Sequence, residues 1–110
     1  MEKKYNKLVR DKIIEIIIAD NENPTYRQLT NEEYWFYLIE KDKEELDEVK
    51  SASSDEEIKR ELADKLEIIR AMASYIGYDL NDIIDEANIK REKRGGFDKR
   101  IFLEKTISNK

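Results

Sequence analysis

The sequence predicts an all-α fold in which four helices form a bundle and a short extended C-terminal arm follows the last helix. Apolar residues recur along the chain at spacings of three and four, the period of helix faces buried in a core. Charged residues make up 43% of the chain, which is typical of long helices with one face in solvent. The 110 residues include three glycines and one proline, so few turns are expected. This length fits a single domain, residues 1–110.

The first helix is predicted over residues 8–20. Apolar side chains form a wide stripe along this segment, at Leu8, Val9, Ile13, Ile14, Ile16 and Ile17. Asn23 and Pro24 then end the pattern, because proline cannot continue a helix. Residues 25–29 are expected to form an extended connection.

The second and third helices are predicted from two capping-box patterns. Thr30 with Glu33 places the start of the second helix near residue 31, and it runs to about residue 50. The small polar residues 51–54 break it, and Ser54 with Glu57 begins the third helix. The most regular core stripe of the chain follows, at Ile58, Leu62, Leu66, Ile69, Ala73 and Ile76.

The fourth helix is predicted between a capping pair and a glycine pair. Gly77 reads as the C-terminal cap of the third helix, and Asp79 with Asp82 indicates a new N-terminus. The helix should reach about Arg94, because Gly95 and Gly96 end it. In residues 97–107, Ile101 and Leu103 alternate and have branched or aromatic neighbours, which favours an extended or docked arm.

The composition excludes several classes of protein. The chain has no cysteine and no histidine, which removes disulfides, Cys/His zinc sites, thiol nucleophiles and imidazole bases. The longest apolar run is far shorter than the roughly 20 residues that a membrane span needs. The N-terminus begins with charge and lacks a secretory apolar core, so we expect a cytoplasmic protein without a membrane partner.

Charge is distributed unevenly along the chain. Residues 40–67 carry twelve acidic and six basic side chains, whereas residues 88–110 carry eight basic and three acidic ones. An acidic middle flanked by basic ends suits a cation and a polyanion bound side by side, although solvated helix faces give similar patterns. The overall net charge of -5 argues against nucleic acid as a partner.

Two acidic motifs lie on consecutive predicted helices. Glu44, Glu45 and Glu48 form an EExxE pattern on the second helix, and Glu61 and Asp64 form ExxD on the third. Side chains three or four residues apart share a helix face, and a short connection makes neighbouring helices pack antiparallel. The two motifs are therefore expected to face each other.

A group of carboxylates brought together repels itself unless a divalent cation neutralises it. Magnesium is the natural candidate, because this hard cation prefers oxygen ligands and commonly bridges protein carboxylates to substrate phosphates. Manganese fits the same donor set.

The two motifs in this order resemble the signature of the all-α nucleoside triphosphate pyrophosphatase superfamily, which includes the MazG proteins. The opening YNKLVRDKI, residues 5–13, and the closing KRGGFDKRIFLEK, residues 93–105, are similar to the ends of small MazG-like proteins labelled phosphoribosyl-ATP pyrophosphohydrolase-like. The resemblance thus covers nearly the whole chain.

This resemblance implies a MazG-like bundle that hydrolyses the bond between the α- and β-phosphates of a nucleotide. The products would be a nucleoside monophosphate and pyrophosphate. It also assigns Glu45, Glu48, Glu61 and Asp64 as metal ligands, and gives Glu44 a supporting part in orienting water. Metal-assisted attack by water is consistent with a chain that lacks histidine.

A polyphosphate substrate also needs positive charge beyond the metal. Guanidinium groups bind phosphate oxygens with two hydrogen bonds, and ammonium groups bind them as point charges. The candidates near the two ends of the chain are Lys7, Arg10, Lys90, Arg91, Arg94 and Arg100. Asn88 is a further candidate for substrate recognition, and an aromatic run at residues 34–37 offers a ring for stacking on a base.

Three interpretations remain open from the sequence. Clearance of noncanonical or excess nucleoside triphosphates fits best, true phosphoribosyl-ATP hydrolysis in histidine synthesis is the enzyme alternative, and a helical interaction module is the non-enzyme alternative. Four helices with this many aromatic residues cannot bury all their apolar surface alone, so a homodimer or homotetramer is expected.

Overall fold

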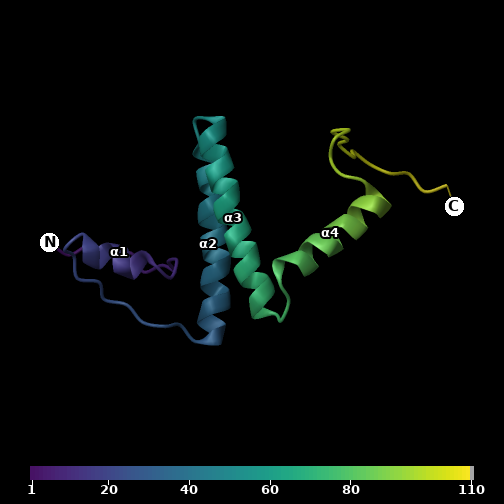
Figure 1. The fold of residues 1–110 in the computed structure, drawn as a ribbon. Helices are drawn as coiled ribbons and strands as arrows, with labels where there is room; N and C mark the ends of the chain where they lie inside the picture. The colour runs from purple at the N-terminus through teal and green to yellow at the C-terminus, as the bar shows by residue number, and fades with distance from the viewer. Residues whose placement is uncertain (110) are drawn as a thin grey trace.

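Four helices joined by loops make up residues 1–109, the part of the chain that the computed structural model describes, and no strand occurs among these residues (Figure 1). Their bounds are α1 Ile13–Ala19, α2 Asn31–Ser51, α3 Asp55–Tyr75 and α4 Leu80–Arg94. The predicted all-α, four-helix class is confirmed, and the bounds of the last three helices agree with the sequence pattern to within two residues.

The predicted start of the first helix is wrong. α1 begins at Ile13 rather than at residue 8, and no side chain caps it. Residues 6–10 instead run as a non-helical segment that we call the N-terminal strap, within which Leu8 and Val9 are half-buried. The predicted apolar stripe is thus split between the strap and α1, and it is only partly covered, since Ile16 is 53% exposed and no residue of α1 is buried.

α2 begins at a complete capping box. The Thr30 hydroxyl accepts a hydrogen bond from the Glu33 N–H at 3.3 Å, and the Glu33 carboxylate accepts one from the Thr30 N–H at 3.0 Å. Arg27 donates two further hydrogen bonds to Glu33, and these lower the pKa of Glu33 to about 2. The box satisfies amide groups that would otherwise lack partners at the helix start.

The start of α3 has one of the two hydrogen bonds of the predicted capping box, and the other has a different partner. Ser54 accepts from the Glu57 N–H at 3.2 Å as expected. The Glu57 carboxylate, however, accepts from the N–H and the hydroxyl of Ser53 rather than from the Ser54 N–H. Ser53 offers its own N–H and hydroxyl one residue earlier in the chain. The Glu57 carboxylate therefore bonds to Ser53, and the cap includes one more residue than predicted.

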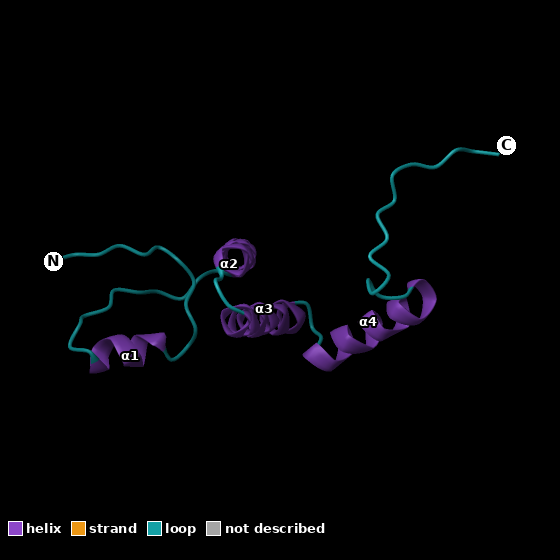
Figure 2. Ribbon diagram, turned by 90° about the horizontal axis from the view of Figure 1, so that it is seen from above, coloured by secondary structure: helices purple, strands orange, loops and turns teal. Residues whose placement is uncertain are grey.

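α2 and α3 pack side by side as an antiparallel hairpin, and this hairpin is the body of the molecule (Figures 1 and 2). Its core contains Leu38, Ile68 and Ala73, each at most 6% exposed. At the end of the hairpin near the start of α2, Trp35 stacks on Tyr75 with ring centroids 5.3 Å apart. The Tyr75 hydroxyl also donates to the Asn31 carbonyl at 3.2 Å, so a hydrogen bond joins the end of α3 to the start of α2.

α4 and the segment after it project away from the hairpin (Figure 1). A capping box between Asp79 and Asp82 begins the helix, and Gly95 at a φ of 82° ends it. The left-handed φ explains the glycine, because other residues adopt it at a cost. Among the described residues α4 packs against α3, while α1 packs against none of the other helices.

The C-terminal arm has no regular secondary structure, as predicted, but it does not dock on its own chain. Its apolar side chains are almost fully exposed, including Phe97, Ile101, Phe102, Leu103 and Ile107. Most of the predicted core stripe of α3 is also open, since Leu62 is 53% exposed and Leu66 is 45% exposed. One chain thus leaves much of its apolar surface in solvent.

The dimensions agree with this open arrangement. The radius of gyration is 19.0 Å, whereas a compact chain of this length has about 13 Å. The accessible surface is 10563 Å², whereas a compact monomer of this size exposes about 6,400 Å². Within residues 1–109, none of the helices combines the length and the apolar character needed to cross a membrane.

Candidate metal centre

Four carboxylates converge in the middle of the α2/α3 hairpin. Glu45 and Glu48 lie one turn apart on α2, and Glu61 and Asp64 lie three residues apart on α3. Each of the four side chains has a carboxylate oxygen that could bind a metal, and these four oxygens all lie within 4.8 Å of one another. We call this group the acidic cluster. The structure therefore brings together all four residues that the sequence proposed as metal ligands.

Burial makes this cluster unlike an ordinary acidic surface. Glu45 is 5% exposed, and its Oε2 atom and that of Glu61 are buried without a hydrogen-bond partner among the described residues. A buried carboxylate oxygen without a donor costs free energy, because it has lost water and gained nothing in return. A cation between the two helices would satisfy both oxygens together.

The electrostatics of the cluster lead to the same requirement. Burial raises the pKa of Glu45 to about 8, and the neighbouring carboxyl groups of Glu61 and Glu48 and the negative charge of Asp64 add to the shift. The pKa of Glu48 is also raised, first by the neighbouring carboxyl group of Glu61 and then by burial. Bound protons would thus relieve the repulsion within the cluster in the absence of a metal. A divalent cation would do so without them.

The donor set decides which metals fit. All four groups offer carboxylate oxygen, and the chain has no histidine or cysteine to add nitrogen or sulfur. Hard divalent cations such as magnesium and manganese prefer oxygen ligands of this kind. The residues present therefore fit a magnesium or manganese ion.

Glu44 lies beside the cluster but belongs to a different network. Its carboxylate accepts hydrogen bonds from Lys7 at 3.2 Å and from Lys41 at 3.5 Å. Burial works to raise the pKa of Glu44, but the hydrogen bond from Lys7 and the charges of both lysines outweigh it and lower the pKa. Glu44 is therefore a permanently charged neighbour of the cluster.

The N-terminal strap brings two of the predicted phosphate contacts to the site. Arg10 donates from Nη2 to Asp64 Oδ1 at 2.7 Å, and Lys7 reaches Glu44. Both cations thus cross from the strap to the hairpin and pair with the acidic motifs. Sequence spacing did not predict these pairs, because the partners lie 54 and 37 residues apart.

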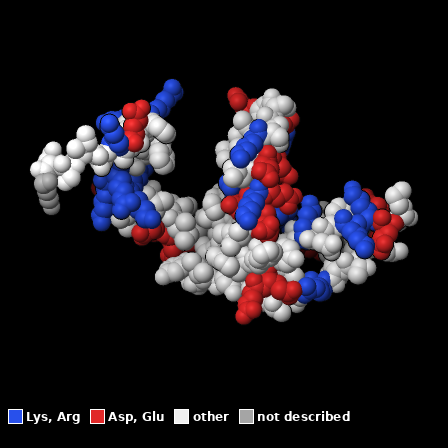
Figure 3. All heavy atoms as spheres, turned by 180° about the vertical axis from the view of Figure 1, so that it is seen from behind, with Lys and Arg blue, Asp and Glu red and all other residues white. Residues whose placement is uncertain are grey.

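The other predicted substrate contacts do not reach the cluster within one chain. Asn88, Lys90, Arg91 and Arg94 lie on α4, which packs against α3 and leads away from the hairpin. Figure 3 shows Asp and Glu gathered over the α2/α3 hairpin, with Lys and Arg gathered over the end of α4 that lies far from the hairpin. Of the predicted substrate contacts, Lys7 and Arg10 of the strap are therefore the two that reach the acidic motifs within one chain.

One contact near the cluster was missed from the sequence. Lys65 on α3 donates to Asp42 on α2 at 2.7 Å, and both side chains are partly covered. The pair links the two helices next to the acidic cluster, because Lys65 follows Asp64 directly. The sequence signal was a lysine next to an acidic motif. Its partner could not be predicted, because it depends on the register in which the two helices pack.

The chain was also compared with known proteins. No protein-family model, curated protein or solved structure matches it. The functional argument therefore rests on the acidic cluster, its surroundings and the motifs of the sequence.

Proposed function

We propose that this chain is a magnesium-dependent nucleotide pyrophosphohydrolase of the MazG-like, all-α type. It would cleave the bond between the α- and β-phosphates of a nucleoside triphosphate, noncanonical or in excess, and release a nucleoside monophosphate and pyrophosphate. The observation that carries the proposal is the buried, unpaired Oε2 atom of Glu45 inside a cluster of four carboxylates.

The acidic cluster would hold the metal through Glu45, Glu48, Glu61 and Asp64. A divalent cation supplies Lewis acidity at the phosphoryl oxygens and at water, which is the main requirement for phosphoryl transfer. The helices hold the four carboxylates in place before the ion arrives. An ion bound by Glu45 and Glu48 on α2 and by Glu61 and Asp64 on α3 would hold the two helices in register.

The groups around the cluster would act on the substrate. Arg10 and Lys7 lie at the cluster and carry the positive charge that a polyphosphate needs. Glu44 keeps its charge at neutral pH, so it can accept a hydrogen bond from the attacking water and orient it. These three residues and the four ligands make up the proposed catalytic machinery.

We also propose that the chain works as a homo-oligomer, a dimer or a tetramer. One copy exposes about 4,000 Å² more surface than a compact monomer of its size. Obligate interfaces bury about 2,000–5,000 Å² in total, so a second copy would cover a surface of this extent. The open stripe of α3 at Leu62, Leu66 and Ile69 repeats at helical spacing, which suits packing against another helix.

The experiment that tests the proposed function measures pyrophosphate released from a panel of canonical and noncanonical nucleoside triphosphates and from phosphoribosyl-ATP. Each substrate is incubated with and without magnesium. The wild type is compared with Glu48→Gln, which keeps the shape of the side chain and removes its charge. Glu56→Gln is the matched control, because Glu56 is an exposed glutamate in the first turn of α3 outside the cluster.

We expect magnesium-dependent release by the wild type and by Glu56→Gln, and a loss of at least about a hundredfold in Glu48→Gln. Release from phosphoribosyl-ATP alone would identify the histidine-pathway reaction. Failure of every substrate, together with no binding of magnesium or manganese in calorimetry, would favour the helical interaction module.

A further inference from the structure

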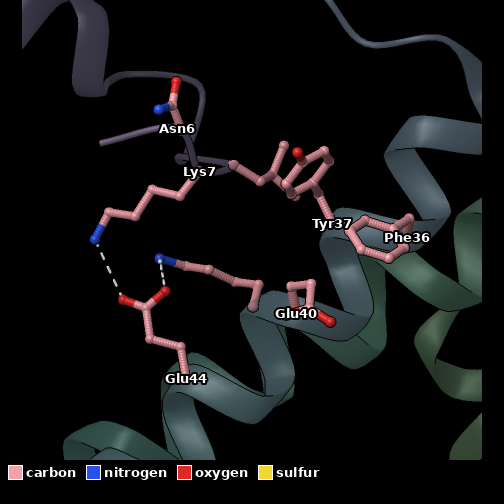
Figure 4. Close-up of a pocket in the computed structure, with 8 residues that line it drawn as sticks. Asn6, Lys7, Phe36, Tyr37, Glu40 and Glu44 are labelled. Carbon is pink, nitrogen blue, oxygen red and sulfur yellow. Dashed lines mark hydrogen bonds and ion pairs between the residues drawn. The ribbon is translucent and has the colours of Figure 1, made fainter. Parts of the chain in front are cut away.

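A hollow lies between the N-terminal strap and the first half of α2, and Glu44, the residue before Glu45 of the acidic cluster, lines it (Figure 4). Its volume is about 260 Å³. Pockets for complete small ligands have about 300–1,000 Å³, so this hollow suits one flat heterocycle rather than a whole nucleotide. Its walls include Leu8 from the strap and Phe36 and Tyr37 from α2.

The walls of the hollow combine an aromatic face with an aliphatic one. The rings of Phe36 and Tyr37 meet edge to face, with centroids 5.1 Å apart and an interplanar angle of 85°. This contact fixes the orientation of Tyr37. Leu8 is half-buried and lines the same hollow. A planar ring inserted here would stack on tyrosine and lie against leucine.

Polar groups stand at the rim of the hollow. Asn6 has a left-handed φ of 46°, a conformation that asparagine tolerates better than most residues. Its side chain points away from Tyr37 and Glu44 (Figure 4), so Asn6 lines the hollow without aiming its amide into it. Glu40 on α2 offers carboxylate oxygens at the opening, and acceptors at the edge of an aromatic slot can read donor groups on the edge of a nucleobase.

The hollow also lies on the face of α2 that leads to the cluster, because Tyr37, Lys41, Glu44 and Glu48 follow one another at helical spacing. Its end toward the cluster is closed by Glu44, which accepts from Lys7 on one side and Lys41 on the other (Figure 4). Glu48 lies four residues after Glu44, one helical turn farther along α2 and on the same face. The hollow, the two ammonium groups bound to Glu44 and the α2 carboxylates of the cluster thus follow one another along α2, in the order in which a nucleotide presents its base and its phosphates.

We propose that this hollow binds the nucleobase of the substrate, with Tyr37 and Leu8 enclosing the ring and Lys7 and Lys41 contacting the phosphate that follows the sugar. The proposal rests on the proposed function, because it names the base subsite of the same nucleotide. It makes the strap part of the substrate site and assigns base selectivity to residues 6–8 and to the first half of α2.

The test measures binding without turnover. The full chain is titrated by calorimetry, in magnesium, with the 5′-monophosphates of adenosine, guanosine, cytidine and uridine, and with ribose 5-phosphate, which lacks a base. The wild type is compared with Tyr37→Leu, which removes the ring and keeps an apolar side chain. Tyr26→Leu is the matched control, because Tyr26 lies outside the hollow and is 67% exposed. Circular dichroism checks the fold, and Leu8→Ala provides a second variant of the hollow.

We expect at least one monophosphate to bind the wild type about tenfold or more tightly than ribose 5-phosphate. Tyr37→Leu and Leu8→Ala should lose about tenfold for that monophosphate and leave ribose 5-phosphate unchanged, and Tyr26→Leu should behave as the wild type. Equal binding of monophosphates and ribose 5-phosphate, or full affinity in both folded variants, would overturn the base subsite. Because these titrations do not depend on hydrolysis, pyrophosphate release can persist when the subsite fails, and the subsite can persist when no release is found.

Discussion

The Arg10 guanidinium donates a hydrogen bond at 2.7 Å to Asp64, although the two residues are 54 positions apart in the chain. Asp64 is one of the four carboxylates of the acidic cluster. The arginine therefore holds one oxygen of a proposed metal ligand. We infer that a metal ion and Arg10 compete for the Asp64 carboxylate, and that an Arg10 displaced by the ion could bind a phosphate.

This competition predicts opposite effects of Arg10→Gln on metal binding and on hydrolysis. Removing the competing cation should raise the affinity for manganese about two- to fivefold, since half-exposed ion pairs contribute at most about 1 kcal/mol. Pyrophosphate release should fall, because the phosphate loses a contact. Calorimetry and kinetics measure the two effects. Lys12→Gln is the control, since it removes the same charge near the strap, and lower metal affinity in Arg10→Gln alone would refute competition.

The pKa of Glu45 predicts how the metal-free protein responds to pH. The folded value is about 8, raised from an ordinary 4.5 chiefly by burial. Between these two values the folded state holds a proton that the unfolded state has released, so stability falls as pH rises through this window. Thermal unfolding of the metal-free protein should therefore give a lower Tm at pH 8 than at pH 5.

Magnesium should change that response, because it replaces the proton in the cluster. Its stabilising effect on Tm should be larger at pH 8 than at pH 5. Glu45→Gln should remove much of the pH dependence, since a neutral amide does not titrate. A metal-free Tm that rises between pH 5 and pH 8 would contradict the assignment of Glu45.

The capping box of α2 predicts a local cost for Thr30→Ala. The variant removes the acceptor of the Glu33 N–H, and loss of such a cap costs about 1 kcal/mol. Chemical denaturation followed by circular dichroism measures the change in the free energy of unfolding. Thr25→Ala, in the exposed connection before α2, should change it by less than about 0.5 kcal/mol. Equal effects of the two substitutions would show that the cap does not stabilise the helix.

The open surface predicts a self-associating chain. Analytical ultracentrifugation should find at least twice the mass of one chain at micromolar concentration. Leu66→Asp places a charge in the open stripe of α3 and should shift the distribution toward the monomer, because burying an unpaired charge is costly. Lys59→Asp changes an exposed residue of the same helix and should leave the mass unchanged. A wild-type chain that remains monomeric would contradict the proposed oligomer.

Much of the fold was available from the sequence because its signals are local. The capping pairs Thr30–Glu33 and Asp79–Asp82 and the glycine at residue 95 predicted the starts of α2 and α4 and the end of α4 to within two residues. The EExxE and ExxD motifs placed four carboxylates correctly, because a short loop between two helices leaves them one way to pack. Local rules and one short connection were sufficient for this part of the site.

The remainder depends on long-range contacts that sequence periodicity does not encode. The strap was taken as helix because Leu8 and Val9 follow an apolar period, but it is non-helical, and its Lys7 and Arg10 pair with distant carboxylates. The open stripe of α3 at Leu62 and Leu66 was predicted as core, since a pattern shows that a face is apolar and does not show what covers it. Both features involve partners far along the chain or outside it.

The most direct test of the central claim identifies the products by phosphorus NMR. The chain is incubated with magnesium and the nucleoside triphosphate that gives the highest pyrophosphate release. A metal centre built from the acidic cluster should yield a nucleoside monophosphate and pyrophosphate in equal amounts, with no signal change in Glu48→Gln. A nucleoside diphosphate with inorganic phosphate, or turnover that persists in Glu48→Gln, would contradict the account.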